Sequence, residues 1–156
     1  MARLTGHELD APPWSRVEGT LLSTARAVRR VYDSALAELD LNFSEASVLA
    51  HLGDGGPLTQ TELARRSGTG RARMGAWVDS LAAKGVVVRN ADPHDRRVWN
   101  VALTSAGREL WQETVRVDTS IRRALRAGTS PEDRSRLDAL LRLINQNADA
   151  LLETLA

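Results

Sequence analysis

Arginine dominates the side chains that could do chemistry in this 156-residue chain. The sequence holds 21 basic residues, and all of them except Lys84 are arginine. A guanidinium group presents planar pairs of N–H donors that match phosphate oxygens and the O6 and N7 edge of guanine. A GC-rich genome accounts for much of this excess. Two close pairs, Arg71 with Arg73 and Arg96 with Arg97, nevertheless point to recognition of an anionic surface.

The positions of the charges sharpen this interpretation. The net charge of the chain is only +1, which by itself does not favour a nucleic-acid partner. Residues 59–97, however, contain eight basic and four acidic side chains, a local charge of +4, and the rest of the chain therefore sums to −3. A solvated charged face is the simpler explanation of such a patch, and only the order of the surrounding elements favours a binding surface.

Other chemistry is poorly supported. The chain has no cysteine, which excludes disulfides, zinc–thiolate sites, cysteine nucleophiles and thiol-based peroxide sensing. The three histidines, His7, His51 and His94, lie far apart in the sequence, so we expect no metal site and no cofactor. No nucleophile–base arrangement occurs, and the glycine run at 53–56 lacks the lysine of a phosphate-binding loop. We therefore expect no enzymatic activity.

Apolar periodicity and capping residues predict six helices and one hairpin. Ser15 with Glu18 and Thr59 with Glu62 have the spacing of capping boxes, while Ser44, Thr104 and Ser130 are further expected N-caps. Gly85 is the expected C-terminal stop of one helix. The predicted helices cover 15–40, 45–51, 60–66, 69–84, 104–127 and 130–156. Two β-branched runs, at 86–89 and 98–103, flank a polar turn and are the predicted hairpin. Residues 1–14 are expected to form an arm and residues 53–57 a loop.

The order of the predicted elements is that of a winged helix-turn-helix: a short helix, a tight turn, a longer helix and a hairpin. One face of the longer helix is apolar, because Met74, Trp77, Val78 and Leu81 recur at the spacing of a buried helix face. The opposite face carries arginines among small residues that allow close approach to bases, namely Arg71, Ala72, Arg73, Gly75 and Ala76. This helix is expected in a major groove about 12 Å wide.

The segment 58–107 resembles the multiple antibiotic resistance regulator (MarR) family of bacterial transcription factors. The resemblance rests on three runs, namely residues 81–89 (LAAKGVVVR), 92–97 (DPHDRR) and 101–107 (VALTSAG). It implies a mainly α fold with a small β-hairpin wing and long N- and C-terminal dimerisation helices. It also implies a homodimer that binds a pseudo-palindromic operator, with 15–40 and 104–156 for dimerisation and 41–103 as the DNA-binding lobe.

The final helix independently favours a dimer, because its wide apolar stripe comes at the end of the chain, where no later element can cover it. An intramolecular helix pair remains the alternative. In the family, an arginine of the wing enters the minor groove and an aspartate orients it; Arg97 and Asp95 match these positions. A surface salt bridge between the two, worth about 0–1 kcal/mol, is the alternative.

These arguments give a set of DNA contacts. The helix starts carry hydroxyl, amide and N–H groups suited to phosphates, and the turn of the hairpin carries basic residues. The expected DNA-binding residues are Thr59, Gln60, Thr69, Gly70, Arg71, Ala72, Arg73, Ala76, His94, Asp95, Arg96 and Arg97.

The resemblance also implies a small aromatic or anionic effector, bound where the dimer helices meet the DNA-binding lobe. Aromatic rings with an arginine suit an aromatic acid. The candidate lining residues are Trp14, Arg16, Tyr32, Phe43, His51, Trp111 and Arg116, with Trp77 a weaker candidate because core packing explains it as well.

The leading hypothesis is a cytoplasmic, ligand-responsive transcriptional repressor that binds double-stranded DNA as a homodimer. The alternative is a winged-helix module for protein–protein contacts without DNA binding, because winged helices do not all bind DNA. Steep weakening of duplex binding by salt distinguishes the two, since phosphate contacts release counterions. No apolar run approaches the ~20 residues that span a bilayer, and the N-terminus has no apolar signal core.

Overall fold

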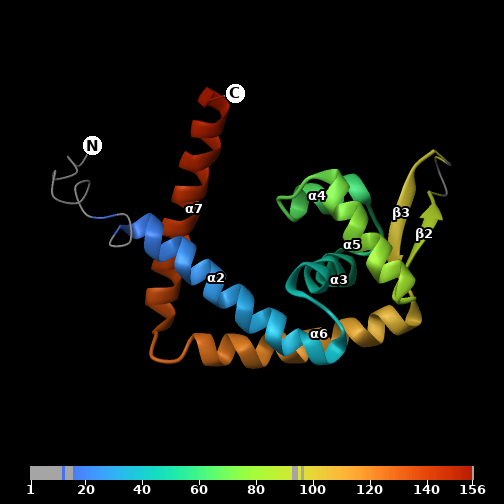
Figure 1. Cartoon of the computed structure of the whole chain (residues 1–156), viewed down its shortest axis with the longest axis horizontal. Coiled ribbons are helices and arrows are strands. Elements are labelled where there is room, and N and C mark those ends of the chain that lie inside the picture. Colours follow the sequence, from blue (N-terminus) through green and yellow to red (C-terminus); the bar gives the residue numbers. More distant parts are fainter. Residues whose placement is uncertain (1–11, 13–15, 93–94, 96, 156) are drawn as a thin grey trace. The chain divides into compact units, whose positions relative to one another are not determined.

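The structure, a computed structural model, describes residues 12, 16–92, 95 and 97–155. These residues form long helices and a small three-stranded antiparallel sheet, which confirms the expected fold class (Figure 1). The chain divides into two compact units, Met1–Ile121 and Arg122–Ala156, which are described separately. The expected N-terminal arm lies, apart from Pro12, outside the described residues.

The first described helix, α2 (Val17–Leu36), begins without a side-chain cap. Arg16 is its N-cap residue, and the expected capping box of Ser15 with Glu18 involves a residue outside the described ones. A single 3-10 turn, η2 (Ala37–Leu39), follows, and Asp40 closes it in the left-handed region at φ 54°. The predicted end of this helical segment near residue 40 is confirmed.

Helix α3 (Phe43–Gly55) is capped by Asn42 rather than by Ser44. The Asn42 side chain accepts a hydrogen bond from the Glu45 N–H, and the Glu45 carboxylate accepts one from the Asn42 N–H. The expectation of a Ser44 cap was wrong because Asn42 fits the same role with a reciprocal partner three residues on. Ser44 is instead buried and lies inside the first turn.

The glycine run does not end α3 where the sequence suggested, because the helix continues through Gly53 to Gly55. A Cβ atom at Gly53 would lie 2.2 Å from the indole ring of Trp111. Glycine therefore stands at position 53 to let the Trp111 ring pack against the helix backbone. The predicted loop begins only at Gly56, whose φ is 72°.

The sheet has the strand order β1-β3-β2, and all its pairs are antiparallel. The two strands of the predicted hairpin are β2 (Val87–Ala91) and β3 (Trp99–Leu103), with Arg89 opposite Val101. The sequence did not predict the third strand, β1 (Leu58–Thr59), because two residues are too short to show periodicity. It pairs with Asn100 and Val101 on the free edge of β3.

Helices α4 (Gln60–Arg66) and α5 (Arg71–Ala83) form the predicted helix-turn-helix. Thr59 caps α4 as expected, while Glu62 turns to Arg65 and Arg66 instead of completing a capping box. Gly68, at φ 58°, makes the turn between the helices, and Gly85, at φ 70°, follows α5. The core of this lobe consists of Leu36, Leu41, Val48, Leu49, Leu52, Leu63, Ala64, Met74, Val78, Leu81, Val86, Val87 and Val101.

One carboxylate ties the C-terminal end of α5 to the start of α3. Glu45 is only 4% exposed, and it accepts a hydrogen bond of 2.5 Å from the Ser80 hydroxyl. The Lys84 ammonium lies 3.2 Å from the same carboxylate and also donates to the main-chain oxygen of Asp40. A buried charge is stable only when it is paired in this way, so this contact fixes one end of α5.

Helix α6 (Ser105–Leu125) begins with the predicted Thr104 cap, whose hydroxyl accepts from the Gly107 N–H at 3.0 Å. The second unit contains α7 (Pro131–Leu155), whose Ser130 and Asp133 form the predicted N-terminal contacts. No residue of α7 is buried within the described chain. Its exposed apolar side chains are Leu137, Leu140, Leu143, Ile144, Leu151, Leu152 and Leu155.

Candidate nucleic-acid interface and the cavity beside it

The exposed face of α5 is the centre of the candidate interface. Met74, Val78 and Leu81 are fully buried, and this fixes the rotation of the helix about its axis. Arg71, Ala72, Arg73 and Ala76 consequently lie on the solvent side, as the sequence predicted. The N-cap residue is Gly70, and no side chain among the described residues accepts from the first N–H groups of the helix. These uncapped donors and the helix dipole favour an anion at this end of α5.

Ion pairs separate the basic side chains of this lobe into two groups. Arg65 and Arg66 both contact Glu62 at 2.7 Å, and these hydrogen bonds, first from Arg65 and then from Arg66, lower the pKa of Glu62 to about 2. Arg89 pairs with Asp79 at 2.6 Å, and Lys84 pairs with Glu45.

The second group of basic side chains consists of Arg71, Arg73 and Arg97. Within the part of the chain that the structure describes, their side chains form no hydrogen bond or ion pair. Because a charge that is already paired gains less from a phosphate, these three arginines are the strongest candidates for DNA contacts.

The polar residues expected at phosphates have structural partners as well. The Thr59 hydroxyl accepts from Glu62, and the Gln60 amide donates to the Arg71 main-chain oxygen at 3.2 Å. Gln60 therefore ties the start of α4 to the first turn of α5. It also packs against Gly75, which explains why this position, expected on the open face, is half-buried. Thr69 precedes α5 and donates its N–H to Ala64.

The turn of the hairpin differs from the expectation in one contact. The Asp95 carboxylate accepts from the main-chain N–H of Arg97 at 2.9 Å, and no hydrogen bond to the Arg97 guanidinium occurs among the described residues. Asp95 thus orients the backbone of the turn rather than the arginine side chain. Arg97 is exposed and free to extend from the wing. The other expected wing contacts, His94 and Arg96, lie outside the described residues.

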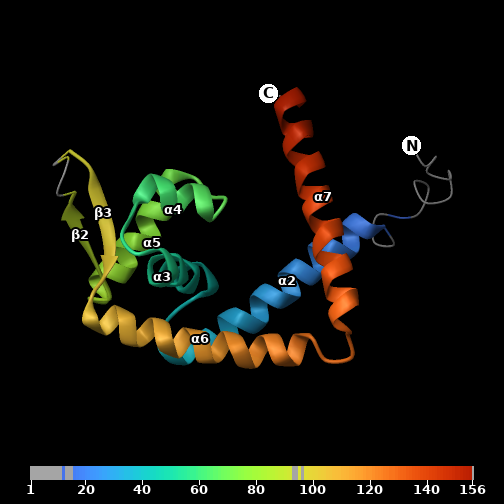
Figure 2. The same ribbon diagram turned by 180° about the vertical axis from the view of Figure 1, so that it is seen from behind.

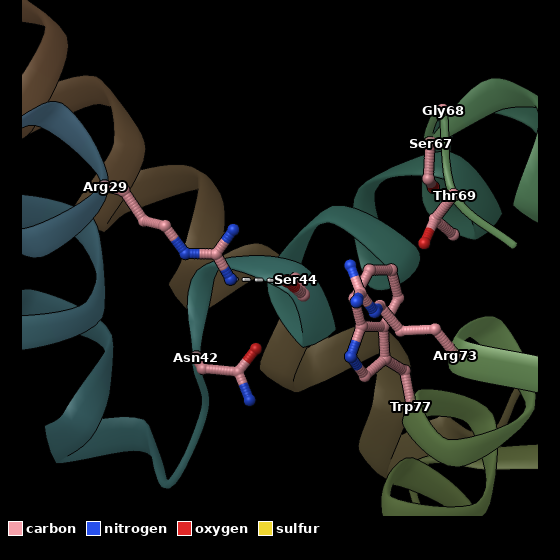
Figure 3. A pocket seen from close by; sticks show the side chains of 8 residues that line it. All are labelled: Arg29, Asn42, Ser44, Ser67, Gly68, Thr69, Arg73 and Trp77. Atoms are coloured by element: carbon pink, nitrogen blue, oxygen red, sulfur yellow. Dashed lines mark hydrogen bonds between the residues drawn. The ribbon is translucent and has the colours of Figure 1, made fainter. Parts of the chain in front are cut away.

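A cavity of about 570 Å³ lies beside the exposed face of α5 (Figure 3). Arg29 of α2 and Arg73 of α5 extend into it from different elements, and Arg29 donates to the Ser44 hydroxyl at 2.8 Å. The buried Ser67 hydroxyl has no hydrogen-bond partner in the described structure. No acidic side chain lines the cavity, whose wall consists of Arg29, Asn42, Ser44, Ser67, Gly68, Thr69, Arg73 and Trp77. The hollow thus presents two guanidinium groups, one aromatic face and one unsatisfied hydroxyl, and Arg29 is also within 3.6 Å of the Asp33 carboxylate.

The residues that the sequence nominated for an effector do not converge on this cavity. Tyr32 and Phe43 do pack together, with ring centroids 5.1 Å apart, but Tyr32 donates to Asp118. Trp111 lines a separate, largely apolar hollow of about 270 Å³, and Arg116 pairs with Glu113. Arg16 is the N-cap residue of α2, His51 is half-buried on α3, and Trp14 lies outside the described residues.

Five residues of the cavity wall were nominated for no site, namely Arg29, Asn42, Ser44, Ser67 and Gly68. Arg29 and Ser67 lie 38 positions apart in the sequence, and neither stands in a recognisable motif. Among the effector candidates that the structure describes, Trp77 alone lines this cavity, where it also packs against the core. The nominated set stays a prediction as an effector site, and within this chain its described members do not share one cavity.

Within the described ranges, no group of three or more histidine, aspartate or glutamate side chains is close enough to hold a metal ion. None of the described helices combines the length and the apolar content that crossing a bilayer requires.

Comparison with known proteins supports the same class. The profile of the MarR family matches residues 39–98. A probable transcriptional regulator from Pseudomonas aeruginosa is 25% identical, with a TM-score of 0.76 over 83% of this chain and 97% of that one.

Two further solved structures share the fold at lower identity. MepR of S. aureus, solved in complex with DNA, is 20% identical, with a TM-score of 0.76 over 84% of this chain and 97% of that one. BpsR of Bordetella bronchiseptica, whose DNA binding is regulated by 6-hydroxynicotinic acid, is 23% identical, with a TM-score of 0.79 over 86% and 96% of the two chains.

The buried face and the open, basic face of α5, together with the hairpin beside them, define a winged helix-turn-helix DNA-binding protein. The segment that holds the helix-turn-helix, residues 39–98, matches the MarR family, and the chain is a DNA-binding transcriptional regulator. The family and the similar structures are regulators rather than enzymes.

Proposed function

We propose that this regulator binds a pseudo-palindromic operator as a homodimer, with α5 in the major groove and the wing in the adjacent minor groove. The proposal is carried by the uncapped start of α5, where Arg71 and Arg73 are exposed and form no hydrogen bond or ion pair with any residue that the structure describes. Two such helices, related by a twofold axis, read two half-sites that are one or more helical turns apart. Because its proposed target is DNA, we expect the protein in the cytoplasm.

Selection and sequencing of DNA fragments retained by the purified protein tests the proposal. We expect an inverted repeat whose half-sites are spaced by about one turn of DNA. Titration of the recovered duplex at several salt concentrations should give a linear fall of log affinity with log salt, because each neutralised phosphate releases counterions. Absence of any duplex binding at low salt would instead favour the alternative of a protein–protein module.

Arg97 is proposed as the minor-groove contact of the wing. A narrow groove has a deep negative potential, and an exposed arginine without an ion-pair partner enters it at little cost. We expect Arg97→Ala to weaken operator binding at least about tenfold and to lower the salt slope by about one. A gel-shift titration measures the affinity, and an unchanged affinity sinks this assignment.

We propose that residues 15–40 and 104–156 form the dimer interface and that 41–103 bind DNA. Support comes from α7, which buries none of its apolar stripe within the single chain. Exposed leucines at Leu140, Leu151 and Leu152 have exposed fractions of 51%, 59% and 65%. Exposure of so many adjacent leucines is unfavourable in water, and burial against a second copy removes it.

Charged side chains placed on the apolar stripe of α7 test the interface. Leu140 and Leu151 lie eleven residues apart, so both fall on the same stripe of α7. We expect the double variant Leu140→Arg, Leu151→Arg to sediment as a monomer, since two guanidinium groups cannot be buried without partners. The matched control Asp149→Arg changes the polar side of the helix and should sediment as a dimer. A double variant that remains dimeric contradicts the role of α7.

The cavity beside α5 is proposed as the effector site. Two arginines and an unsatisfied hydroxyl suit a carboxylate or phenolate, and the Trp77 ring provides a flat apolar wall. By analogy with BpsR and its 6-hydroxynicotinic acid, the ligand of this regulator is a small aromatic acid. Binding that favours a state of the dimer with the wrong spacing of its two lobes would release the operator, so the protein acts as a repressor.

A further inference from the structure

The wing carries a large aromatic side chain that the proposed function leaves unexplained. Trp99 is the first residue of β3, and its side chain is 57% exposed. Burial of apolar surface stabilises a protein by about 25 cal/mol per Å2, and an exposed indole ring does not contribute this free energy. It also carries an N–H group that can donate to an anion. Trp99 therefore combines an apolar face and a donor at the surface of the DNA-binding lobe.

The pairing of the strands fixes the side of the hairpin on which Trp99 lies. Side chains alternate along a strand, so Trp99 shares a face with Val101, which is only 1% exposed. Across the ladder, Arg89 pairs with Val101 and Ala91 pairs with Trp99, which places all of them on one face of the hairpin. This is the face that turns toward the helices of the lobe.

A contact to α5 locates this face more closely. The Arg89 guanidinium reaches the carboxylate of Asp79 at 2.6 Å. Asp79 follows Ala72 and Ala76 at helical spacing on the exposed stripe of α5 that is proposed to face DNA. Trp99 lies diagonally across the ladder from Arg89 on the same face and nearer the turn of the hairpin, so it is on the side of the hairpin that Arg89 links to α5. Figure 2 shows the hairpin of β2 and β3 beside α5.

We infer that Trp99 packs against the sugar–phosphate backbone that passes between α5 and the wing. This inference rests on the proposed function, because a helix in the major groove and a wing in the minor groove place one DNA strand between them. The indole ring then covers a deoxyribose, and its N–H donates to a phosphate oxygen. The neighbouring Arg97 makes the surroundings of Trp99 attractive to an anionic backbone.

The opposite face of the hairpin supplies a matched control. Val88 is 40% exposed and pairs with Ala102, so it lies on the face directed away from α5. Trp99 and Val88 are thus both exposed apolar residues of the hairpin, but Trp99 lies on the face toward α5 and Val88 lies on the opposite face. A general need for apolar surface on the wing affects both, whereas a contact to the DNA strand affects only Trp99.

The experiment compares Trp99→Ala, Trp99→Phe and Val88→Ala with the wild-type chain on the selected operator and on an unrelated duplex. We expect Trp99→Ala to weaken binding to both duplexes about five- to tenfold and Trp99→Phe about two- to threefold, because a phenyl ring keeps the packing but loses the donor. Val88→Ala should stay within about twofold. The salt slope of Trp99→Ala should equal that of the wild type, because an indole displaces no counterion.

The outcomes are separable. If the wild-type chain binds no duplex, the proposed function itself fails. If it binds and Trp99→Ala binds equally well, the inference on Trp99 is overturned, and the exposed indole belongs to a protein contact instead. If Trp99→Ala binds DNA more weakly only because the fold is destabilised, a lowered melting temperature reveals it. In that case the affinity of Trp99→Phe decides, and wild-type affinity of Trp99→Phe would also overturn the inference.

Discussion

Replacement of Arg73 by alanine is expected to weaken operator binding by about ten- to a hundredfold and effector binding by at least about tenfold. The first effect follows from the loss of a guanidinium pair at a base or phosphate, worth about 1–3 kcal/mol. The second follows because Arg73 also lines the cavity beside α5, where a bound carboxylate would lose a charged donor. One side chain is thus expected to serve two ligands.

Arg71 provides the control for this result. It is exposed on the same turn of α5 and has no ion-pair partner among the described residues, but it does not line the cavity. Arg71→Ala should lose operator affinity to a similar degree and keep effector affinity within about twofold. Duplex titration measures the first property. Titration with 6-hydroxynicotinic acid, followed by tryptophan fluorescence and calorimetry, measures the second, and equal effector affinity of the two variants contradicts the role of Arg73.

The second large effect is on stability. At Gly107, a Cβ atom would lie 1.9 Å from the main-chain oxygen of Val86, which is the oxygen that accepts from the Thr104 N–H. The start of α6 therefore rests directly on the backbone between α5 and β2. Gly107→Ala should reduce the free energy of unfolding by about 3 kcal/mol or more, because backbone rather than a flexible side chain must move.

Chemical unfolding at one fixed protein concentration checks this value, because a dimer gains stability with concentration. The neighbouring exposed residue Ala106 supplies the control, and Ala106→Ser should change the free energy of unfolding by no more than about 0.5 kcal/mol. If Gly107→Ala unfolds at the same denaturant concentration as the wild type, the start of α6 can shift without loss of stability, and the prediction is wrong.

The sequence predicted those elements whose signals are local. Capping by Thr104 and Ser130 and the glycine stop at Gly85 depend on residues within three or four positions, and the structure confirms all three. The alternation of faces on α5 was predictable for the same reason. The exposed positions of Arg71, Ala72, Arg73 and Ala76 on α5 could accordingly be predicted before the fold was known, while their contacts with DNA stay a prediction.

Errors arose where a distant residue decides the local structure. The glycines after Leu52 read as a loop, yet Trp111, 58 positions away from Gly53, packs where a side chain would stand. The cavity could not be predicted, because Arg29, Ser67 and Arg73 belong to three separate elements without a shared motif. The Asp95 contact was misassigned because spacing alone does not tell a main-chain acceptor from a side-chain one.

The buried contact of Glu45 with Ser80 and Lys84 has a mechanical consequence for α5. It anchors the C-terminal end of the helix to α3, whereas the N-terminal end follows a glycine turn and has no side-chain cap. The N-terminal end is held more weakly, by the exposed hydrogen bond from Gln60 to the Arg71 main-chain oxygen, although Met74, a few positions further on, is buried. A small rotation about the anchored end therefore displaces Arg71 and Arg73 more than it displaces Ser80, and we expect it to alter their proposed contacts with DNA.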